Sequence, residues 1–395
     1  MTRFLVVGLT LALAALGVQY VLRPATDLDR EQFIERSEQA IDRGNWGGLE
    51  AIAREWAELD PGNPQPWDYA AQAAMQLGSP ELAADYLKEA LPNGGVDIYQ
   101  KLGFIQMEFL NDPLGTKATC DQTIAKFPDD SQTHERLLFY YTMTCQRNEV
   151  VEEAVRAIGE GCDTLATYAY LVSAKWMTFT NGYETNLKWL QAAPEEELFE
   201  VAAVLQLPSY SRLDELAREV VEPGSEPRPL EYAASRVRTL RDKYPENVQL
   251  LAIETRDLCR AGDVRAVGER LAKIGEDSLL DNRFWRFKGW FHNARQEYLP
   301  ARQAYEKAIE LNPFDWATRV ELATLLRTTE GIEASKEVQK LADTGKQLMF
   351  AIQDCPNLHL LEPASIYDDL IAYFKDCGQE DLANGLTLRL QEAGR

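Results

Sequence analysis

Arginines at helical spacing are the residues of this chain with the clearest capacity for chemistry. Arg256 and Arg260 are four positions apart and Arg283 and Arg286 are three apart, so each pair would share one face of a helix. A guanidinium group binds a carboxylate through two parallel hydrogen bonds, and it keeps its charge when it is partly desolvated. These residues therefore predict the binding of acidic groups rather than the making or breaking of bonds.

Motifs of catalysis and of metal binding are missing from the sequence. It contains no GxSxG, HExxH, GxxxxGK[ST] or GxGxxG. Its three histidines, His134, His292 and His359, lie far apart, and none neighbours a cysteine. We therefore expect no enzyme activity, no metal site and no cofactor.

The cysteines form neither a CxxC motif nor a Cys/His group at zinc spacing. Their even number permits disulfides in an oxidising compartment, and the alternative is that they are small apolar residues buried between helices. The six residues are Cys120, Cys145, Cys162, Cys259, Cys355 and Cys377.

Composition narrows the class of protein. Alanine, leucine and glutamate are abundant, which favours helices. The chain has 41 Lys and Arg against 63 Asp and Glu, a net charge of −22. A nucleic-acid binder needs a basic surface, so we expect no nucleic-acid partner.

An apolar run occupies residues 4–22, between Arg3 and Arg23-Pro24. As a helix it would extend roughly 28 Å, close to the hydrocarbon thickness of a bilayer. The segment 1–24 is interpreted as an uncleaved signal anchor, or alternatively as a cleaved signal peptide. Either interpretation predicts a membrane-anchored or exported protein. Lys and Arg on the two sides of the run are almost balanced, so export of the soluble part is favoured but a cytoplasmic orientation stays open.

A repeat of 34 residues supplies the elements that must position the arginines. One unit is marked by Trp285, Gly289, Tyr298, Ala301, Tyr305, Ala308 and Pro313. Another, 64–97, is marked by Trp67, Gly78, Ala83, Leu87 and Ala90. The pattern resembles the tetratricopeptide repeat (TPR) superfamily, with no closer family assigned. This resemblance implies an all-α, right-handed solenoid of helix hairpins, in which Trp67 and Trp285 pack inside their units.

Prolines after helix ends show where the repeat loses its phase. Pro61 and Pro128 are 67 residues apart and Pro245 and Pro313 are 68 apart, both close to two repeats, whereas Pro128 and Pro245 are 117 apart. We therefore predict an N-terminal TPR-like block over 25–162, an irregular helical joint and linker over 163–230, and a C-terminal TPR block with capping helices over 231–395. The Pro- and Gly-rich stretch 222–229 is the predicted hinge.

The TPR resemblance also implies which residues face the concave groove of the first helices. In the C-terminal block these positions carry arginines and no acidic residue, and Trp290 and Asn293 lie among them. The predicted partner-binding groove therefore consists of Arg256, Arg260, Arg283, Arg286, Trp290, Asn293 and Arg327. The alternative is that these arginines stand at exposed positions by chance and pair with glutamates of neighbouring helices.

The sequence thus predicts a membrane-tethered TPR scaffold or adaptor, acting in cell-envelope assembly, that binds protein or peptide partners with acidic segments through its groove. A receptor for a small acidic or peptide ligand is the alternative function. An enzyme with its active site in 163–230 is a third, which that segment disfavours because it contains no histidine.

Overall fold

A computed structural model describes residues 27–220, 226, 228–355 and 357–394. The apolar run 4–22, the predicted anchor 1–24 and most of the predicted hinge lie outside these residues. Among the residues described, no helix is both long enough and apolar enough to span a bilayer.

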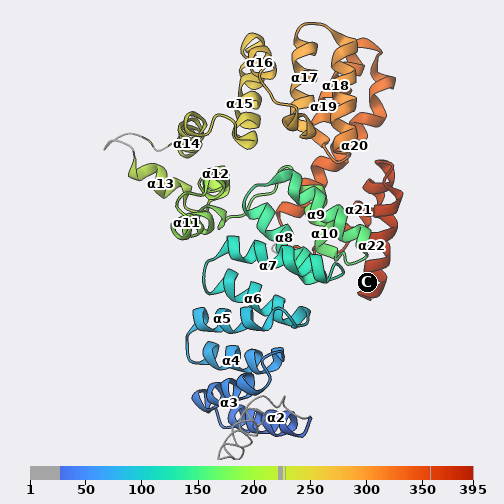
Figure 1. The fold of residues 1–395 in the computed structure, drawn as a ribbon. Helices are drawn as coiled ribbons and strands as arrows, with labels where there is room; N and C mark the ends of the chain where they lie inside the picture. The colour runs from blue at the N-terminus through green and yellow to red at the C-terminus, as the bar shows by residue number, and fades with distance from the viewer. Residues whose placement is uncertain (1–26, 221–225, 227, 356, 395) are drawn as a thin grey trace, which may run out of the picture. The chain divides into compact units, whose positions relative to one another are not determined.

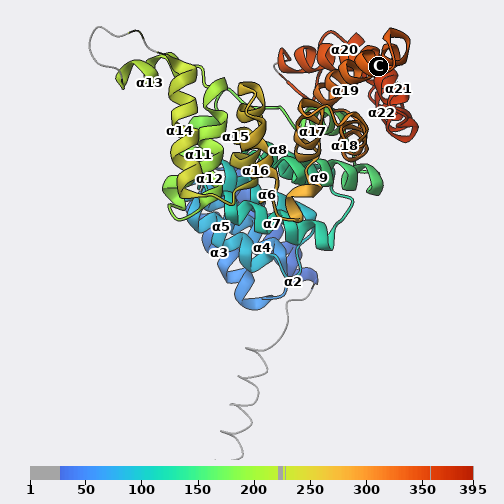
Figure 2. The same ribbon diagram turned by 90° about the horizontal axis from the view of Figure 1, so that it is seen from above.

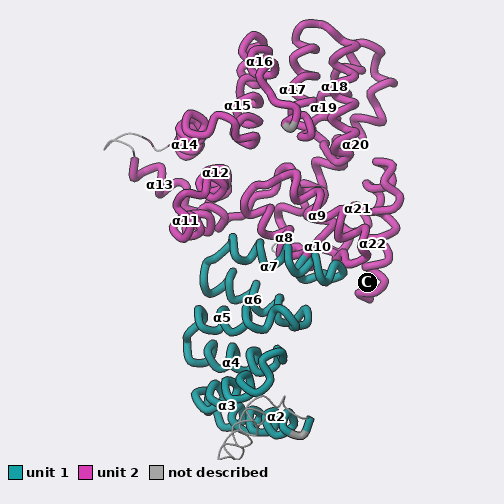
Figure 3. The backbone as a smooth tube through the Cα atoms, in the orientation of Figure 1, with its two compact units in different colours: residues 1–133 teal, residues 134–395 magenta. Residues whose placement is uncertain are grey.

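The described residues form helices and no strands, which confirms the predicted all-α class. The chain divides into two compact units, Met1–Thr133 and His134–Arg395 (Figure 3). Helix α8 (Ser131–Met143) contains the division point. The predicted boundaries after residues 162 and 230 both lie within unit 2.

Unit 1 is a run of helices that pack in chain order (Figure 1). Prolines begin three of them, because the first turn of a helix does not need the N–H that proline lacks. The buried side chains between the helices are mainly small, and the fully buried Trp56 stacks on Phe33 with ring centroids 5.6 Å apart. The helices are α2 (Asp27–Asp42), α3 (Trp46–Leu59), α4 (Pro64–Gln76), α5 (Pro80–Ala90), α6 (Val96–Glu108) and α7 (Pro113–Lys126).

Unit 2 begins with shorter and less regular helices. After α8 these are α9 (Arg147–Glu160), α10 (Leu165–Ser173), α11 (Gly182–Ala192), α12 (Glu197–Gln206), the 3-10 helix η1 (Leu207–Ser209) and α13 (Leu213–Glu219). Helices α11 and α12 pack on each other, and α14 (Pro229–Lys243) packs on α12 (Figure 2).

The remainder of unit 2 returns to regular helix pairs. It contains α15 (Val248–Ala261), α16 (Val264–Leu271), the 3-10 helix η2 (Asp277–Leu280), α17 (Asn282–Ala294), α18 (Tyr298–Leu311), α19 (Trp316–Thr329), α20 (Ile332–Gln353), α21 (Ser365–Asp376) and α22 (Glu380–Glu392). The 34-residue period is measured directly here, because α15, α17 and α19 begin 34 residues apart and so do α16, α18 and α20.

The helix caps repeat with the same period. Asn247, Asp281 and Asp315 precede α15, α17 and α19, and the side chain of each accepts a hydrogen bond from a backbone N–H of the first turn. Such caps satisfy donors that have no partner within the helix. The middle cap, Asp281, has a second role described below.

Close packing within the α17–α18 hairpin explains the repeat glycine. A Cβ atom on Gly289 would lie 2.4 Å from the ring of Tyr305, which is 1% exposed. Only glycine leaves room for that ring, so this sequence signal reports a contact between the two helices of one unit.

The C-terminal hairpin of unit 2 packs back on its beginning. Helices α20 and α22 both contact α10. Arg389 of α22 forms an ion pair with Asp163 at 3.1 Å, and the rings of Phe374 and Tyr168 lie 6.0 Å apart. The segment after residue 163, predicted as a joint, therefore contributes to the packed core of unit 2.

One detail of the repeat interpretation needs correction. Trp285 was expected to pack inside its unit, but its side chain is only half-buried and its indole N–H donates to the carbonyl of Leu279 at 2.9 Å. The buried residues of α17 are Phe284 and Phe287, which are 0% and 3% exposed.

This pair of neighbours gives a test of the packing. We expect Phe284→Ala to lower the free energy of unfolding by about 3–5 kcal/mol, because it leaves a cavity in the core. Trp285→Ala should cost clearly less, since that side chain is only partly buried. Urea unfolding of both variants measures the difference, and an equal or larger loss for Trp285→Ala would contradict the assignment.

Candidate functional site

The largest group of predicted site residues surrounds a cavity in unit 2. Two adjoining recesses, of about 480 and 660 Å³, share the lining residues Lys175, Trp176, Ile253, Arg256, Arg260 and Arg283. We call them together the arginine cavity. Helices α15, α17 and α19 form one wall of the first recess, and α12 and α14 contribute apolar side chains to the second. Both volumes lie in the range of ligand pockets.

The structure brings together five of the seven residues predicted for the groove. Arg256, Arg260, Arg283, Arg286 and Trp290 all line the arginine cavity. Asn293 and Arg327 do not. Arg327 is exposed and lines a separate recess between α19 and α20, whereas Asn293 is half-buried on α17 and lines neither part of the cavity.

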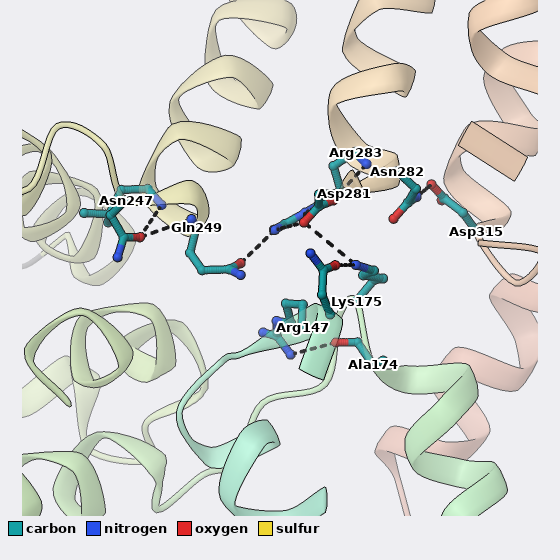
Figure 4. Close-up of polar contacts among 11 residues, drawn as sticks. Arg147, Ala174, Lys175, Asn247, Gln249, Asp281, Asn282, Arg283 and Asp315 are labelled. Atoms are coloured by element: carbon teal, nitrogen blue, oxygen red, sulfur yellow. Dashed lines mark hydrogen bonds and ion pairs between the residues drawn. The ribbon is translucent and has the colours of Figure 1, made fainter. Parts of the chain in front are cut away.

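Asp281 holds the floor of the cavity together. Its carboxylate is 0% exposed and accepts hydrogen bonds from Arg283 at 2.6 and 3.0 Å. The ammonium group of Lys175, which follows α10, lies 3.8 Å away (Figure 4). Arg283 also donates to the Oε1 atom of Gln249 on α15 at 2.8 Å. Asp281 therefore links the start of α17 to the segment after α10, and Arg283, which it binds, extends the link to α15.

The pKa values of this cluster follow from burial and charge. Burial acts to raise the pKa of Asp281, but the positive charges of Arg283 and Lys175 outweigh it and hold that pKa below its usual range. Burial lowers the pKa of Lys175 to about 8, although Asp281 acts in the opposite direction. The Asp281 carboxylate is therefore ionised at neutral pH, as its role requires.

A second buried arginine supports the chain that carries Lys175 and Trp176. Arg147, at the start of α9, donates to the carbonyl of Ala174 at 3.2 Å (Figure 4). It also donates to the carbonyl of Met177. These carbonyls lie where α10 has ended and no longer have helix partners. Burial lowers the pKa of Arg147.

Among the arginines of the cavity that have hydrogen-bond donors left for a ligand, Arg286 is the most enclosed. Its side chain is 17% exposed and lies 3.7 Å from Glu321 and 3.9 Å from Asp315. Both separations are too long for direct hydrogen bonds, and the Nε atom of Arg286 has none. Burial raises the pKa of Glu321 to about 7, while Arg286 acts to lower it. At neutral pH, Glu321 therefore neutralises Arg286 only in part.

Arg256 and Arg260 form the more open side of the cavity. Arg256 is 40% exposed and is paired with its sequence neighbour Asp257 at 2.9 Å. Arg260 is exposed, one turn further along α15. Because exposed pairs of this kind contribute little free energy, both guanidinium groups can exchange their present contacts for a ligand carboxylate at small cost.

Aromatic side chains complete the lining. Trp176, Trp290 and Trp316 lie around the first recess together with Phe287 and Phe314. Flat aromatic surfaces beside guanidinium groups favour ligands that carry both apolar and negatively charged parts. Arginine does not exchange protons near neutral pH, so the guanidinium groups themselves suit binding rather than proton transfer.

Sequence reasoning missed Lys175 and Trp176, which line both recesses. They lie in the segment where the repeat signal is absent, so the TPR frame gives them no groove position. A tryptophan next to a lysine just after the strongly apolar run 165–173 was the only available signal.

Unit 1 has a smaller and different recess. It has a volume of about 420 Å³, and its lining is mostly apolar, including Met75, Phe104 and Phe109. Its acidic residue, Asp68, is paired with Lys101 at 2.7 Å. The concentration of unpaired or weakly paired arginines is therefore a property of the cavity in unit 2.

Removal of the Asp281 charge tests the role of this carboxylate. We expect Asp281→Asn to lower the free energy of unfolding by about 3–5 kcal/mol, because Arg283 and Lys175, which are only 15% and 13% exposed, lose their buried counter-charge. Asparagine is also a good helix cap, so the cap itself is retained. Urea unfolding measures the loss. Asp257→Asn, at an exposed ion pair of the same cavity, is the control, and equal losses in the two variants would contradict the role of Asp281.

A pH series tests the environment of Glu321. Its folded pKa of about 7 lies above the ordinary 4.5, so the folded chain binds more protons between these values. Stability from this group is complete below pH 4.5 and is lost as the pH rises through 7. Since a third of the side chain is exposed, we expect a loss on the order of 1 kcal/mol. Glu321→Gln, which resembles the protonated form, should lack that loss, and parallel pH profiles of the two proteins would contradict the shift.

Comparison with known proteins gives matches among solved structures alone. No family model matches the chain, and no curated protein matches it. The solved structures include MamA, which is 14% identical over 49% of this chain and 96% of that chain, with a TM-score of 0.31. A tetratricopeptide repeat protein from Parabacteroides merdae is 12% identical over 75% and 98%, with a TM-score of 0.26. Yeast Tom70 is 11% identical over 93% and 97%, with a TM-score of 0.28. The 34-residue spacing of helix pairs, measured in this structure, is the feature that makes the chain similar to TPR proteins.

Proposed function

We propose that this protein is a scaffold or adaptor that binds a partner protein through the arginine cavity, and that the bound element is a peptide segment carrying carboxylates. The observation that carries the proposal is the clustering of arginines and tryptophans around one cavity, in a chain whose net charge is −22. Stacked helix pairs commonly present such concave surfaces to partners.

The charges of the cavity support an acidic ligand. Arg283 is fully engaged by Asp281 and Gln249, so it orders the floor. Arg256, Arg260 and Arg286 retain donors for a ligand. A carboxylate placed between Arg256 and Arg286 would replace weak or distant contacts to Asp257, Asp315 and Glu321 with direct charge-assisted hydrogen bonds.

The aromatic lining supports a peptide over a simple anion. Trp290 and Trp316 offer flat apolar surfaces, which an inorganic ion would not use. A peptide would use them, because an apolar side chain could pack on the tryptophan rings while a neighbouring aspartate or glutamate binds the guanidinium groups. Aromatic residues commonly anchor a partner at the centre of a protein interface, and charged groups surround them at the rim.

A receptor for a small acidic molecule is the second candidate. The volume of each recess, about 480 and 660 Å³, favours this alternative, because it matches that of pockets for small ligands. The two functions differ in the size of the ligand, and a small dicarboxylic acid that raises the melting temperature of the purified protein would favour the receptor.

We further propose that residues 4–22 tether the protein to a membrane or direct its export, and that it acts in cell-envelope assembly. Support for this comes from the sequence, where the apolar run is long enough to cross a bilayer.

Charge reversal in the cavity tests the proposal. We expect Arg256→Glu with Arg260→Glu to abolish capture of the partner from cells, and to weaken binding of acidic peptides on an array by at least about tenfold, because charge-assisted hydrogen bonds become repulsions. Peptides with free and with amidated C termini show whether the terminal carboxylate takes part.

The control is Arg265→Glu with Arg302→Glu, which makes the same change of charge on arginines outside the cavity. Both variants are checked for helix content. Equal binding by the wild-type protein and the cavity variant would refute the proposed site.

A further inference from the structure

A group of metal-ligating side chains lies at the junction of α8 and α9, separate from the arginine cavity. His134 is in the first turn of α8, and Glu160 and Cys162 are at the end of α9. One ligand atom of each residue lies within 4.8 Å of the other two. His134 is 1% exposed and Cys162 is 7% exposed, whereas Glu160 reaches the surface.

The end of α9 explains why Glu160 and Cys162 meet. Gly161 ends the helix with φ at 72°, a left-handed conformation that glycine adopts without strain. The backbone N–H of Cys162 then bonds back to the carbonyl of Ala157 at 3.0 Å. This turn places the thiol beside the helix end, next to the preceding glutamate.

His134 is oriented for ligation by a buried carboxylate. Its Nδ1 atom lies 2.5 Å from the Oε1 atom of Glu153, which is 0% exposed and is also paired with Arg156. When Nδ1–H donates to Glu153, the Nε2 atom carries a lone pair that faces the Oε2 atom of Glu160 at 3.4 Å. Metal-binding histidines typically donate the N–H of the non-ligating ring nitrogen to a carboxylate in this way.

We propose that His134, Glu160 and Cys162 bind a zinc ion. The ligands would be the Nε2 atom of His134, a carboxylate oxygen of Glu160 and the thiolate of Cys162, with water in the fourth position. On binding, the thiol proton of Cys162 is released to solvent. The ion would enter from the solvent on the side of Glu160, which is exposed. Once bound, it would link the start of α8 to the end of α9.

The ligand set selects zinc over other divalent ions. Thiolate and imidazole are ligands of zinc, whereas magnesium and calcium prefer sites made only of oxygen atoms. A tetrahedral zinc site needs its ligand atoms closer together than 4.8 Å, so binding requires the side chains of Glu160 and Cys162 to rotate and the Cys162 thiol to leave its hydrogen bond to the carbonyl of Ala157 at 3.4 Å. Sequence reasoning did not predict this site, because its ligands do not follow the spacing of a known zinc motif.

The alternative is a protonated His134 held between Glu153 and Glu160 without a metal. The two arrangements differ in the part played by the thiol, because an ion pair of this kind does not use Cys162. A test that reports on sulfur therefore separates them.

The experiment uses the full-length protein, purified with reduced thiols and stripped of metal. Cobalt(II), which takes the place of zinc in such sites, is added and the thiolate-to-cobalt charge-transfer absorption is recorded. Zinc affinity is then measured by competition with a chromophoric chelator. We expect one equivalent of zinc and a charge-transfer band. Cys162→Ser should lose the band, and Glu160→Gln should weaken zinc binding at least about tenfold.

Cys355→Ser is the matched control, because the Cys355 thiol donates to a backbone carbonyl, that of Ala351, but belongs to no cluster of metal-ligating side chains among the described residues. It should keep both the band and the zinc affinity. Helix content shows that each variant is folded. Absence of a band in the wild-type protein, or an unchanged band in Cys162→Ser, would overturn the proposal.

Discussion

The ion cluster around Asp281 is the interaction on which the candidate site depends. Asp281 caps α17 as the corresponding residues Asn247 and Asp315 cap α15 and α19, so it stands at a repeat position that any unit of this array would fill with a short polar residue. In this unit the cap is also buried, and it binds Arg283 and faces Lys175. A helix cap has thereby become the counter-charge that allows cations to line an enclosed cavity. Without it, Arg283 and Lys175 would repel each other across a region of low dielectric constant.

The cavity separates structural arginines from arginines with remaining bonding capacity. Arg147 is buried and Arg283 is 15% exposed, and both are satisfied by carbonyls, an amide oxygen or the Asp281 carboxylate, so they fix the loops and helix ends that form the floor. Arg256, Arg260 and Arg286 lie above this floor with weak, distant or exchangeable partners. Because the chain has a net charge of −22, the acidic partner proposed above would be repelled by the protein as a whole and attracted to this cavity, which would favour one orientation of binding.

Sequence reasoning predicted the regular parts of this molecule and the local part of the site. The 34-residue period predicted the helix pairs that begin at Val248. It could do so because the glycine and the small residues of the repeat stand where two helices of one unit touch, as Gly289 touches Tyr305. It also placed Arg256 and Arg286 on the first helices of successive repeats, α15 and α17, which pack side by side. It failed where geometry depends on contacts distant in sequence. Lys175 lines the cavity and Asp163 pairs with Arg389 because the irregular helices pack against helices that lie far away in the sequence. Phe284 is buried in place of Trp285 because the helix is rotated by one residue relative to the expected position. The 34-residue pattern does not determine that rotation.

The central claim is that the arginine cavity receives an acidic segment of a partner protein. The most direct measurement is site-specific photo-crosslinking in cells from position 253, because Ile253 lines both recesses. Mass spectrometry of the crosslinked product identifies the partner and the attached peptide. We predict one dominant partner, crosslinked through a segment rich in aspartate or glutamate, and loss of this product when Arg256 and Arg260 are changed to glutamate. A crosslink to a neutral or basic segment, or one that survives the charge reversal, would contradict the account.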